Sequence, residues 1–454
     1  METIKKNKEY VVDIIDNGID GEGIAKIDNF TVFVPQTIKG EKVKILIVKV
    51  LTSYAYGKVI EILKASKDRL CIDCNTYLRC GGCSLRFMKY EKTLELKKEL
   101  VKNCFKKAIK KDLEVCDTIG MEKPFYYRNK LQYPVGLNKN NQPVIGVFAK
   151  RTHDIIPTRI CMIQNKKLQE IANDSFDFLI RNGVEPYNEK KQTGELRHIV
   201  VRIGVKTNEV MLILVINRHN IKNEVEFANY ISNKHPEIKT IVKNINNKNT
   251  NVILGKENEV IFGDGYIYDI LGKYKFKISP MSFYQINPIQ TEILYNNAIE
   301  NANLTKDDVI LDLYCGIGTI GIFASQYVKK VYGIEIIENA IKDANENLKI
   351  NNILNAEYLC GDVEKTLPII IEKEKISPTV VFIDPPRKGC DSNTISNLKK
   401  IKPRKIIYIS CNPATLARDV AMLNDVYEIK MVQPVDMFPY TSHVECVSLL
   451  TLKK

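Results

Sequence analysis

One cysteine stands where nucleophilic chemistry is favoured. Cys411 lies in Ile-Ser-Cys-Asn-Pro, where an apolar run over residues 405–410 gives way to a helical pattern that begins at about Pro413. A helix N-terminus favours negative charge, and the thiolate is the reactive form of cysteine. A lone cysteine is more often a small core residue, but further motifs at predicted strand ends coincide with this one. We therefore predict that Cys411 is a nucleophile.

A carboxylate follows another buried strand in Phe-Ile-Asp-Pro-Pro-Arg, residues 382–387. Proline fixes φ and lacks an amide donor, so this turn is stiff and aims Asp384. In parallel α/β sheets, ligands bind at the carboxyl ends of the strands. Amino-methylating enzymes have a similar acidic-Pro-Pro motif that continues with an aromatic residue. Arg387 occupies that place here, which argues against an exocyclic nitrogen as the acceptor.

A glycine-rich loop predicts a nucleotide-like cofactor. Residues 312–319, Asp-Leu-Tyr-Cys-Gly-Ile-Gly-Thr, end a strand and open a helix, and glycine lets the backbone approach a ligand closely. Glu335 ends the next strand about 20 residues later, where an acidic side chain suits a ribose diol. From Gly316 to Gly321 the loop also reads G-x-G-x-x-G. The loop alone therefore does not separate NAD from S-adenosylmethionine.

A thiolate beside S-adenosylmethionine suits methylation of C5 of uracil, a carbon too weakly nucleophilic to take a methyl group directly. Addition of Cys411 to C6 makes C5 carbanionic, and C5 can then attack the methyl group. A base must next remove the C5 proton. Glu445, in His443-Val444-Glu445 before the last apolar run, is the candidate base.

A cysteine cluster near residue 80 predicts a metal site. Cys74 is followed by Cys80-Gly-Gly-Cys83, and Cys71 lies three residues before Cys74. Zinc is one interpretation, through the pairs Cys71–Cys74 and Cys80–Cys83. Five residues between these pairs is short against the roughly 15–20 of a zinc ribbon. The spacing therefore favours an iron–sulfur cluster.

Composition is that of a folded, basic, multidomain protein. The chain has 454 residues, of which 44% are hydrophobic and 27% charged, which excludes wholesale disorder. Its length predicts about three domains. The net charge of +13 indicates a polyanionic partner. No apolar run approaches the ~20 residues of a membrane helix, and no signal peptide opens the chain. We therefore expect a cytoplasmic monomer without a membrane partner.

The pattern of elements predicts an α/β protein of three parts. Residues 1–65 read as short strands of a small closed β-barrel. Residues 66–275 hold the cysteine cluster and a mixed α/β domain, and they include a helix over 90–111 whose lysines are expected on a solvated face. Residues 276–454 alternate buried strands with amphipathic helices, which predicts a parallel sheet covered on both faces.

These motifs resemble those of the RNA uracil-C5 methyltransferases, specifically the 23S ribosomal RNA branch, over nearly the whole chain. The resemblance implies a Rossmann-like class I methyltransferase domain that uses S-adenosylmethionine. It implies that Cys411 in Ser-Cys-Asn-Pro is the nucleophile and that Glu445 in His-Val-Glu is the base. It further implies cofactor contacts from Gln285 in Ser-Phe-Tyr-Gln, Tyr314, Glu335, Asp384 and Asp362 in Gly-Asp-Val-Glu.

The rest of the chain resembles that branch too. Phe-Val-Pro at 33–35 and Gly-Glu-Lys-Val at 40–43 fit a TRAM domain, an RNA-binding module. The resemblance implies that Cys74, Cys80 and Cys83 join Cys161 in Arg-Ile-Cys-Met to hold a [4Fe-4S] cluster. In this resemblance the transfer RNA branch lacks both features, so 23S ribosomal RNA is the expected substrate.

Two other functions fit parts of the sequence. An RNA cytosine-C5 methyltransferase also uses a cysteine nucleophile, but it has a second Pro-Cys motif where this chain has Pro-Pro-Arg at 385–387. A catalytically silent RNA-binding iron–sulfur protein would not need Cys411 and Glu445 together.

Overall fold

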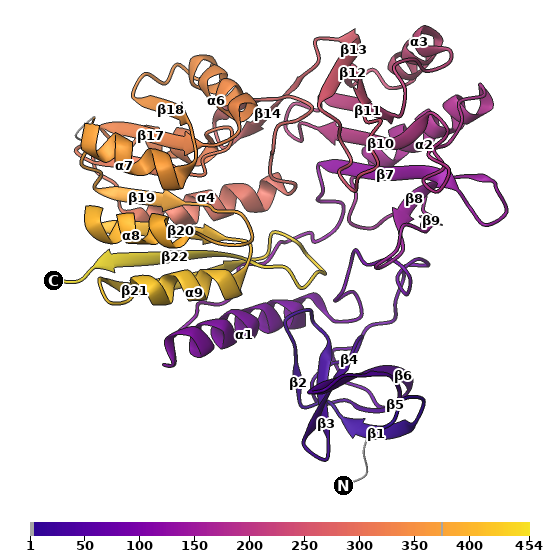
Figure 1. The fold of residues 1–454 in the computed structure, drawn as a ribbon, viewed down its shortest axis with the longest axis horizontal. Helices are drawn as coiled ribbons and strands as arrows, with labels where there is room; N and C mark the ends of the chain where they lie inside the picture. The colour runs from indigo at the N-terminus through magenta and orange to yellow at the C-terminus, as the bar shows by residue number, and fades with distance from the viewer. Residues whose placement is uncertain (1–3, 374–375) are drawn as a thin grey trace.

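The computed structural model describes residues 4–373 and 376–454. The chain forms an N-terminal sheet, a central sheet with two covering helices, and a C-terminal sheet with helices on both faces (Figure 1). The C-terminal sheet confirms the predicted α/β class. In the described residues no helix is both long and apolar enough to cross a membrane.

The N-terminal sheet is rolled rather than closed by strand pairing. Its strands are β1 (Glu9–Asp13), β2 (Asp16–Asn17), β3 (Gly23–Ile27), β4 (Phe30–Val34), β5 (Lys42–Val50) and β6 (Tyr54–Lys64). They pair in the order β1-β5-β6-β4-β3-β2. We expected a closed barrel, but β1 and β2 stand at opposite ends of this order. Only residues 14–15 separate the end of β1 from the start of β2, and Ile15 N donates to Ile24 O at 2.8 Å. One bent segment therefore supplies both edge strands of the sheet.

The central region is built on a seven-stranded sheet of order β13-β12-β11-β10-β7-β8-β9. Its strands are β7 (Lys130–Leu137), β8 (Pro143–Phe148), β9 (Ile155–Pro157), β10 (Leu196–Ile203), β11 (Val210–Ile216), β12 (Ile238–Ile245) and β13 (Glu257–Gly263). Helices α2 (Lys166–Arg181) and α3 (Glu224–Lys234) bury apolar faces against it. All seven residues of β11 are buried, which is why this strand reads as a continuous apolar run.

The C-terminal region follows a hairpin of β14 (Ile267–Leu271) and β15 (Tyr274–Ile278). Its strands are β16 (Val309–Leu313), β17 (Lys330–Glu335), β18 (Ala356–Cys360), β19 (Val380–Ile383), β20 (Lys405–Ser410), β21 (Tyr427–Val435) and β22 (Glu445–Leu452). Its helices are α4 (Pro288–Ala302), α5 (Thr319–Ser325), α6 (Glu338–Ile350), α7 (Val363–Lys373), α8 (Ser392–Ile401) and α9 (Pro413–Leu423).

The order of this sheet is β18-β17-β16-β19-β20-β22-β21. Strands β16 to β20 pair in parallel, whereas β22 is antiparallel to both β20 and β21. The carboxyl ends of the parallel strands therefore meet at one edge. The glycine loop, Glu335, Asp384 and Cys411 all follow strands at that edge.

Helix α1 (Tyr90–Ile109) packs away from the central sheet. Its residues Val101 and Phe105 belong to the core around β19 and β20, and the helix lies along α9 (Figure 1). Lys97, expected on a solvated face, is fully buried and pairs with Asp436 at 2.5 Å. The expectation was wrong for Lys97 because its partner lies 339 residues later in the chain.

The division of the chain into three domains, with boundaries at residues 65 and 275, stays a prediction.

Candidate active site

Cys411 occupies the turn between β20 and α9. The Asn412 side chain caps α9 by accepting from Ala414 N at 3.0 Å, and Pro413 is the first helical residue. Ser410 Oγ accepts from Asn412 N at 3.1 Å and tightens the same turn. The Ser-Cys-Asn-Pro sequence thus stops the strand and starts the helix, which leaves the Cys411 thiol half-buried at the sheet edge.

Three charged side chains surround this thiol. Glu445, the first residue of β22, is only 4% exposed. Glu445 and Asp384 act on the thiol as negative charges, and the Arg387 guanidinium acts on it as a positive charge. The structure therefore brings together Cys411, Glu445 and Asp384, which the sequence places on three different strands. Arg387 joins them, although its place in the motif had indicated only that the methyl acceptor is not an exocyclic nitrogen.

Burial governs the protonation of these groups. It raises the pKa of Glu445 to about 8, with help from the Asp384 charge and against the opposing charge of Arg387. Burial likewise raises the pKa of Asp384 to about 7. Desolvation disfavours the charged form of an acid, and a second carboxylate nearby adds to that effect. The two acids can thus hold or release protons near neutral pH.

The pKa of the Cys411 thiol differs from the one that we expected. We expected the start of α9 to favour a thiolate, yet burial and the Glu445 and Asp384 charges raise the pKa of Cys411 to about 11. Arg387 opposes this rise without cancelling it. The thiol of the unliganded site therefore carries its proton at neutral pH. A further positive charge, or protonation of the carboxylates, would favour the thiolate.

Acidic side chains lie at the glycine loop, beside this group. Gly316 has a φ of +55°, and a Cβ built on it would meet nothing within 4 Å, so this face of the loop is open. Glu335 accepts from Gly316 N at 3.1 Å and from Ile337 N at 2.9 Å. Asp312 Oδ2 accepts from Gly321 N at 2.8 Å, whereas its buried Oδ1 has no partner among the described residues. These groups fit a ligand that carries hydroxyls and positive charge.

The remaining predicted cofactor residues lie around the same edge. The Gln285 side chain is hydrogen-bonded to the Tyr295 hydroxyl, which lies 3.2 Å from Thr319 Oγ1 at the start of α5. Tyr314 has a φ of +64°, and its hydroxyl is hydrogen-bonded to Thr394. Asp362 Oδ1 accepts from Glu364 N at 3.1 Å and caps α7.

Sequence reasoning missed Asp312 and Tyr295. Asp312 stood inside the quoted glycine motif, and its position directly before the loop was the available signal. Tyr295 carried no such signal, because α4 brings it to the loop from outside any motif.

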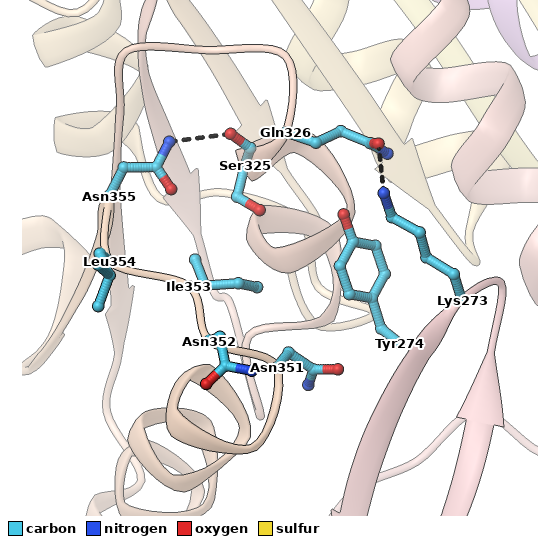
Figure 2. Close-up of a pocket in the computed structure, with 9 residues that line it drawn as sticks. All are labelled: Lys273, Tyr274, Ser325, Gln326, Asn351, Asn352, Ile353, Leu354 and Asn355. Carbon is cyan, nitrogen blue, oxygen red and sulfur yellow. Dashed lines mark hydrogen bonds between the residues drawn. The ribbon is translucent and has the colours of Figure 1, made fainter.

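A separate pocket of about 480 Å³ lies at the opposite edge of the sheet (Figure 2). Asn355 precedes β18 and Ser325 precedes β17, so this pocket faces the amino ends of the strands. Asn355 Nδ2 donates to Ser325 O at 2.9 Å, and Lys273 Nζ donates to Gln326 Oε1 at 2.7 Å (Figure 2). These polar groups are paired with protein, and the residues that line the pocket include no Cys, His, Asp or Glu.

The cysteine cluster forms a second sulfur site. Cys74, Cys80, Cys83 and Cys161 line one cavity of about 430 Å³, whereas Cys71 is exposed and lies outside that lining. Burial and the neighbouring thiols raise the pKa of Cys83 to about 12. In the described part of the chain, no three Cys, His, Asp or Glu side chains form a group that could hold a single metal ion.

Basic groups surround those thiols. Arg86, Arg128, Lys150 and Arg151 line the same cavity. Arg128 Nε is buried there and finds no acceptor among the residues that the structure describes. The cavity therefore offers four sulfur ligands together with positive charge.

Comparison with known proteins assigns the family. A family model described as tRNA (uracil-5-)-methyltransferase matches residues 89–453, and a TRAM domain model matches residues 5–60. This chain belongs to the uracil-5 RNA methyltransferase family. It is therefore an S-adenosylmethionine-dependent RNA methyltransferase with an N-terminal TRAM domain.

Relatives of this methyltransferase span its full length. An uncharacterized RNA methyltransferase of Clostridium acetobutylicum is 47% identical over 98% of both chains. Another, of Staphylococcus aureus, is 43% identical over 100% of both chains.

A solved structure extends the comparison. The crystal structure of Pyrococcus abyssi tRNA (uracil-54, C5)-methyltransferase, in complex with S-adenosyl-L-homocysteine, superposes with a TM-score of 0.77 at 27% identity. The match covers 98% of this methyltransferase and 100% of that chain. It therefore extends through most of the N-terminal sheet. The N-terminal sheet alone therefore does not distinguish a ribosomal from a transfer RNA substrate.

Proposed function

We propose that this methyltransferase transfers a methyl group to C5 of a uracil in 23S ribosomal RNA through a covalent bond between Cys411 and C6. The observation that carries the proposal is the meeting of Cys411, Glu445, Asp384 and Arg387 beside the open glycine loop. A nucleophile, a carboxylate whose pKa lies near neutrality and a positive charge are what addition at C6 and removal of a C5 proton require. The proposed enzyme acts as a monomer in the cytoplasm.

The chemistry begins with Cys411. Its proton passes to solvent, and the thiolate forms a bond to C6 while the C5–C6 π electrons move toward the C4 carbonyl. The positive charge of Arg387 lowers the pKa of the thiol and so favours the thiolate. Bound S-adenosylmethionine, held by the residues of the glycine loop and by Glu335, supplies the methyl group that C5 takes.

Glu445 then completes the reaction. Its carboxylate takes the C5 proton, the electrons of that C–H bond restore the C5–C6 double bond, and the C6–S bond breaks. The electron pair of that bond leaves on Cys411. Because burial raises the pKa of Glu445 to about 8, most of the enzyme holds Glu445 protonated at pH 7 and cannot complete this step until it ionises.

The variant Glu445→Gln tests the mechanism. It keeps Cys411 and the glycine loop but has no base for the C5 proton, so a methylated protein–RNA adduct should accumulate and survive denaturing electrophoresis. Glu428→Gln, an exposed glutamate on the neighbouring strand β21, is the matched control and should release product normally. Turnover of Glu445→Gln at the control rate without an adduct would reject Glu445 as the base.

Mapping the methylated uracil in both candidate RNAs tests the RNA target. We propose 23S ribosomal RNA because the TRAM domain and cysteine motifs resemble that branch. Transfer RNA is the second candidate, because the structural neighbour is named for uracil 54 of transfer RNA. Mass-spectrometric mapping of both RNAs from cells with and without the gene identifies the methylated uracil. Loss of the modification from transfer RNA alone would overturn the ribosomal assignment.

We also propose that Cys74, Cys80, Cys83 and Cys161 hold a [4Fe-4S] cluster. One cavity gathers the four thiols, and its basic lining offsets their negative charge as thiolates. In such a cluster each thiolate binds a different iron atom, so the sulfurs need not converge on one ion. A tetrahedral zinc site would instead bring four sulfurs within about 2.3 Å of one metal. Iron and acid-labile sulfide analysis after anaerobic purification tests this proposal.

A further inference from the structure

The cysteine segment contacts the loop that leads to Glu445. This loop, residues 436–444, joins β21 to β22, and Glu445 follows it directly. Residues 84–86 come immediately after Cys83 and bind the second half of the loop. Leu85 N donates to Tyr440 O at 2.9 Å, and Ser442 N donates to Ser84 Oγ at 2.9 Å.

Arg86 is the strongest side-chain contact between the two segments. It is 7% exposed, and its guanidinium carbon lies 4.3 Å from the centre of the Tyr440 ring and 4.6 Å from that of Phe125. The same guanidinium donates to both oxygens of Asp73 at 2.7 and 2.9 Å. Asp73 directly precedes Cys74, and Arg86 itself lines the cysteine cavity. Arg86 therefore ties both ends of the cysteine segment to the 436–444 loop.

The loop holds a conformation that needs such support. Tyr440 has a φ of +62°, a left-handed conformation that is unfavourable for a bulky side chain. The first half of the loop has separate anchors on α1, where Lys97 and Tyr90 bind the Asp436 carboxylate at 2.5 and 2.8 Å. The half that runs into Glu445 is bound by residues 84–86, and its Tyr440 ring also packs against Tyr90 and Phe125.

We propose that Arg86 and Tyr440 are positioning residues that hold the 436–444 loop over Glu445 and thereby set the rate of the proton-removal step. Cys411 and Asp384 follow β20 and β19, so displacement of this loop reaches Glu445 before it reaches the nucleophile. This inference rests on the proposed function. It gives the cysteine segment a direct part in the active site, in addition to any contact with RNA.

The experiment separates methyl transfer from release. For Arg86→Gln, single-turnover methyl transfer should stay within about 3-fold of wild type. Release of the adduct should slow by about 10- to 100-fold, because a small displacement of a catalytic group costs rate on that scale. The methylated adduct should then accumulate.

Arg69→Gln is the matched control. Arg69 also pairs with a carboxylate through two nitrogens, both at 2.6 Å from Glu41, and stacks on Phe87 at 5.1 Å. Its hydrogen bonds go to Glu41 and Gln36, in the N-terminal sheet region. Its replacement removes a comparable interaction and should leave the ratio of adduct to free product unchanged.

A second variant keeps the test decisive if Arg86→Gln folds poorly. Tyr440→Leu removes the ring on which Arg86 stacks and should shift the same ratio in the same direction. The double variant should add little to either single change, because both remove one contact. Normal release by both variants, or an equal loss of transfer and release, would overturn the proposal. Failure of Glu445→Gln to trap an adduct would instead point to the proposed function itself.

Discussion

Two cysteine sites in this protein each hold a thiol whose pKa is raised, but the side chains around the two thiols differ. Burial raises the pKa of Cys411 to about 11 and that of Cys83 to about 12. At Cys411 the next contributions come from the carboxylates Glu445 and Asp384. At Cys83 they come from Cys161, Cys80 and Cys74, in a cavity lined with basic side chains.

This difference indicates that the neighbouring side chains, rather than burial, determine whether a thiol suits a nucleophile or a metal ligand. A single thiol beside two acids that titrate near neutral pH can exchange its proton locally, which suits a nucleophile that forms and breaks one bond. Cys80 and Cys83, whose pKa values are raised by burial and by neighbouring thiols, lose their protons more readily when cations bind among them. Under the proposed assignments, cysteine sulfur is a nucleophile at one site and a cofactor ligand at the other.

The largest expected effect comes from removing the single thiol. Cys411→Ala leaves the four-cysteine cavity intact but should lower methyl transfer on the order of 10⁴-fold or more, because no covalent adduct can form. Transfer of labelled methyl to RNA measures the loss. Cys360→Ala, which removes an exposed thiol, is the control. If Cys411→Ala retained both the adduct and turnover, the nucleophile would have to be another group.

Removing one of the four thiols should break the other site. Cys83→Ser should lose most of the bound iron, because a serine hydroxyl is a poor replacement for a thiolate ligand. Iron content and absorbance of the anaerobic protein measure the loss. Full iron retention by this variant, or zinc in place of iron in the wild type, would contradict the assignment.

The release step should depend on pH. Glu445 must be ionised to accept the proton, and its pKa is raised to about 8. Release from a preformed adduct should therefore rise with pH, fall about tenfold per unit below pH 7, and level off above about 9. Asp384→Asn removes a charge that raises this pKa, so the inflection should move to lower pH. Single-turnover release across pH 6–9.5 measures both profiles, and a flat wild-type profile would exclude Glu445.

The smallest expected effect distinguishes zinc from iron–sulfur. Cys71 is exposed and lies outside the cavity lining, so Cys71→Ser should leave metal content within experimental error of wild type. Loss of metal from this variant would favour the zinc arrangement of paired cysteines over the cluster.

Sequence predicted the position of the site better than its protonation. Strand periodicity placed Asp384 and Cys411 at the ends of parallel strands, and parallel strands necessarily bring those ends together. The Cys411 pKa could not be predicted in the same way. It depends on how deeply two carboxylates from β19 and β22 are buried, and no local pattern encodes that depth.

Contacts distant in sequence account for most of what was missed. The lysine pattern of α1 looked solvated because Asp436, the partner of Lys97, carries no signal in its own segment. Arg387 was visible in its motif, but its approach to Cys411 depends on the packing of two loops. The sequence marked Cys161 only through the family resemblance, since it lies far from the other three cysteines.

The ion pair between Lys97 and Asp436 also constrains how the chain is made. These residues are 339 positions apart, so at ~5–20 residues per second a ribosome adds the second roughly 15 to 70 s after the first. During that interval α1 has no α9 to cover Val101 and Phe105, and the Lys97 ammonium has no carboxylate. The packing of α1 against α9 and the Lys97–Asp436 ion pair can therefore form only when nearly the whole protein has been synthesised.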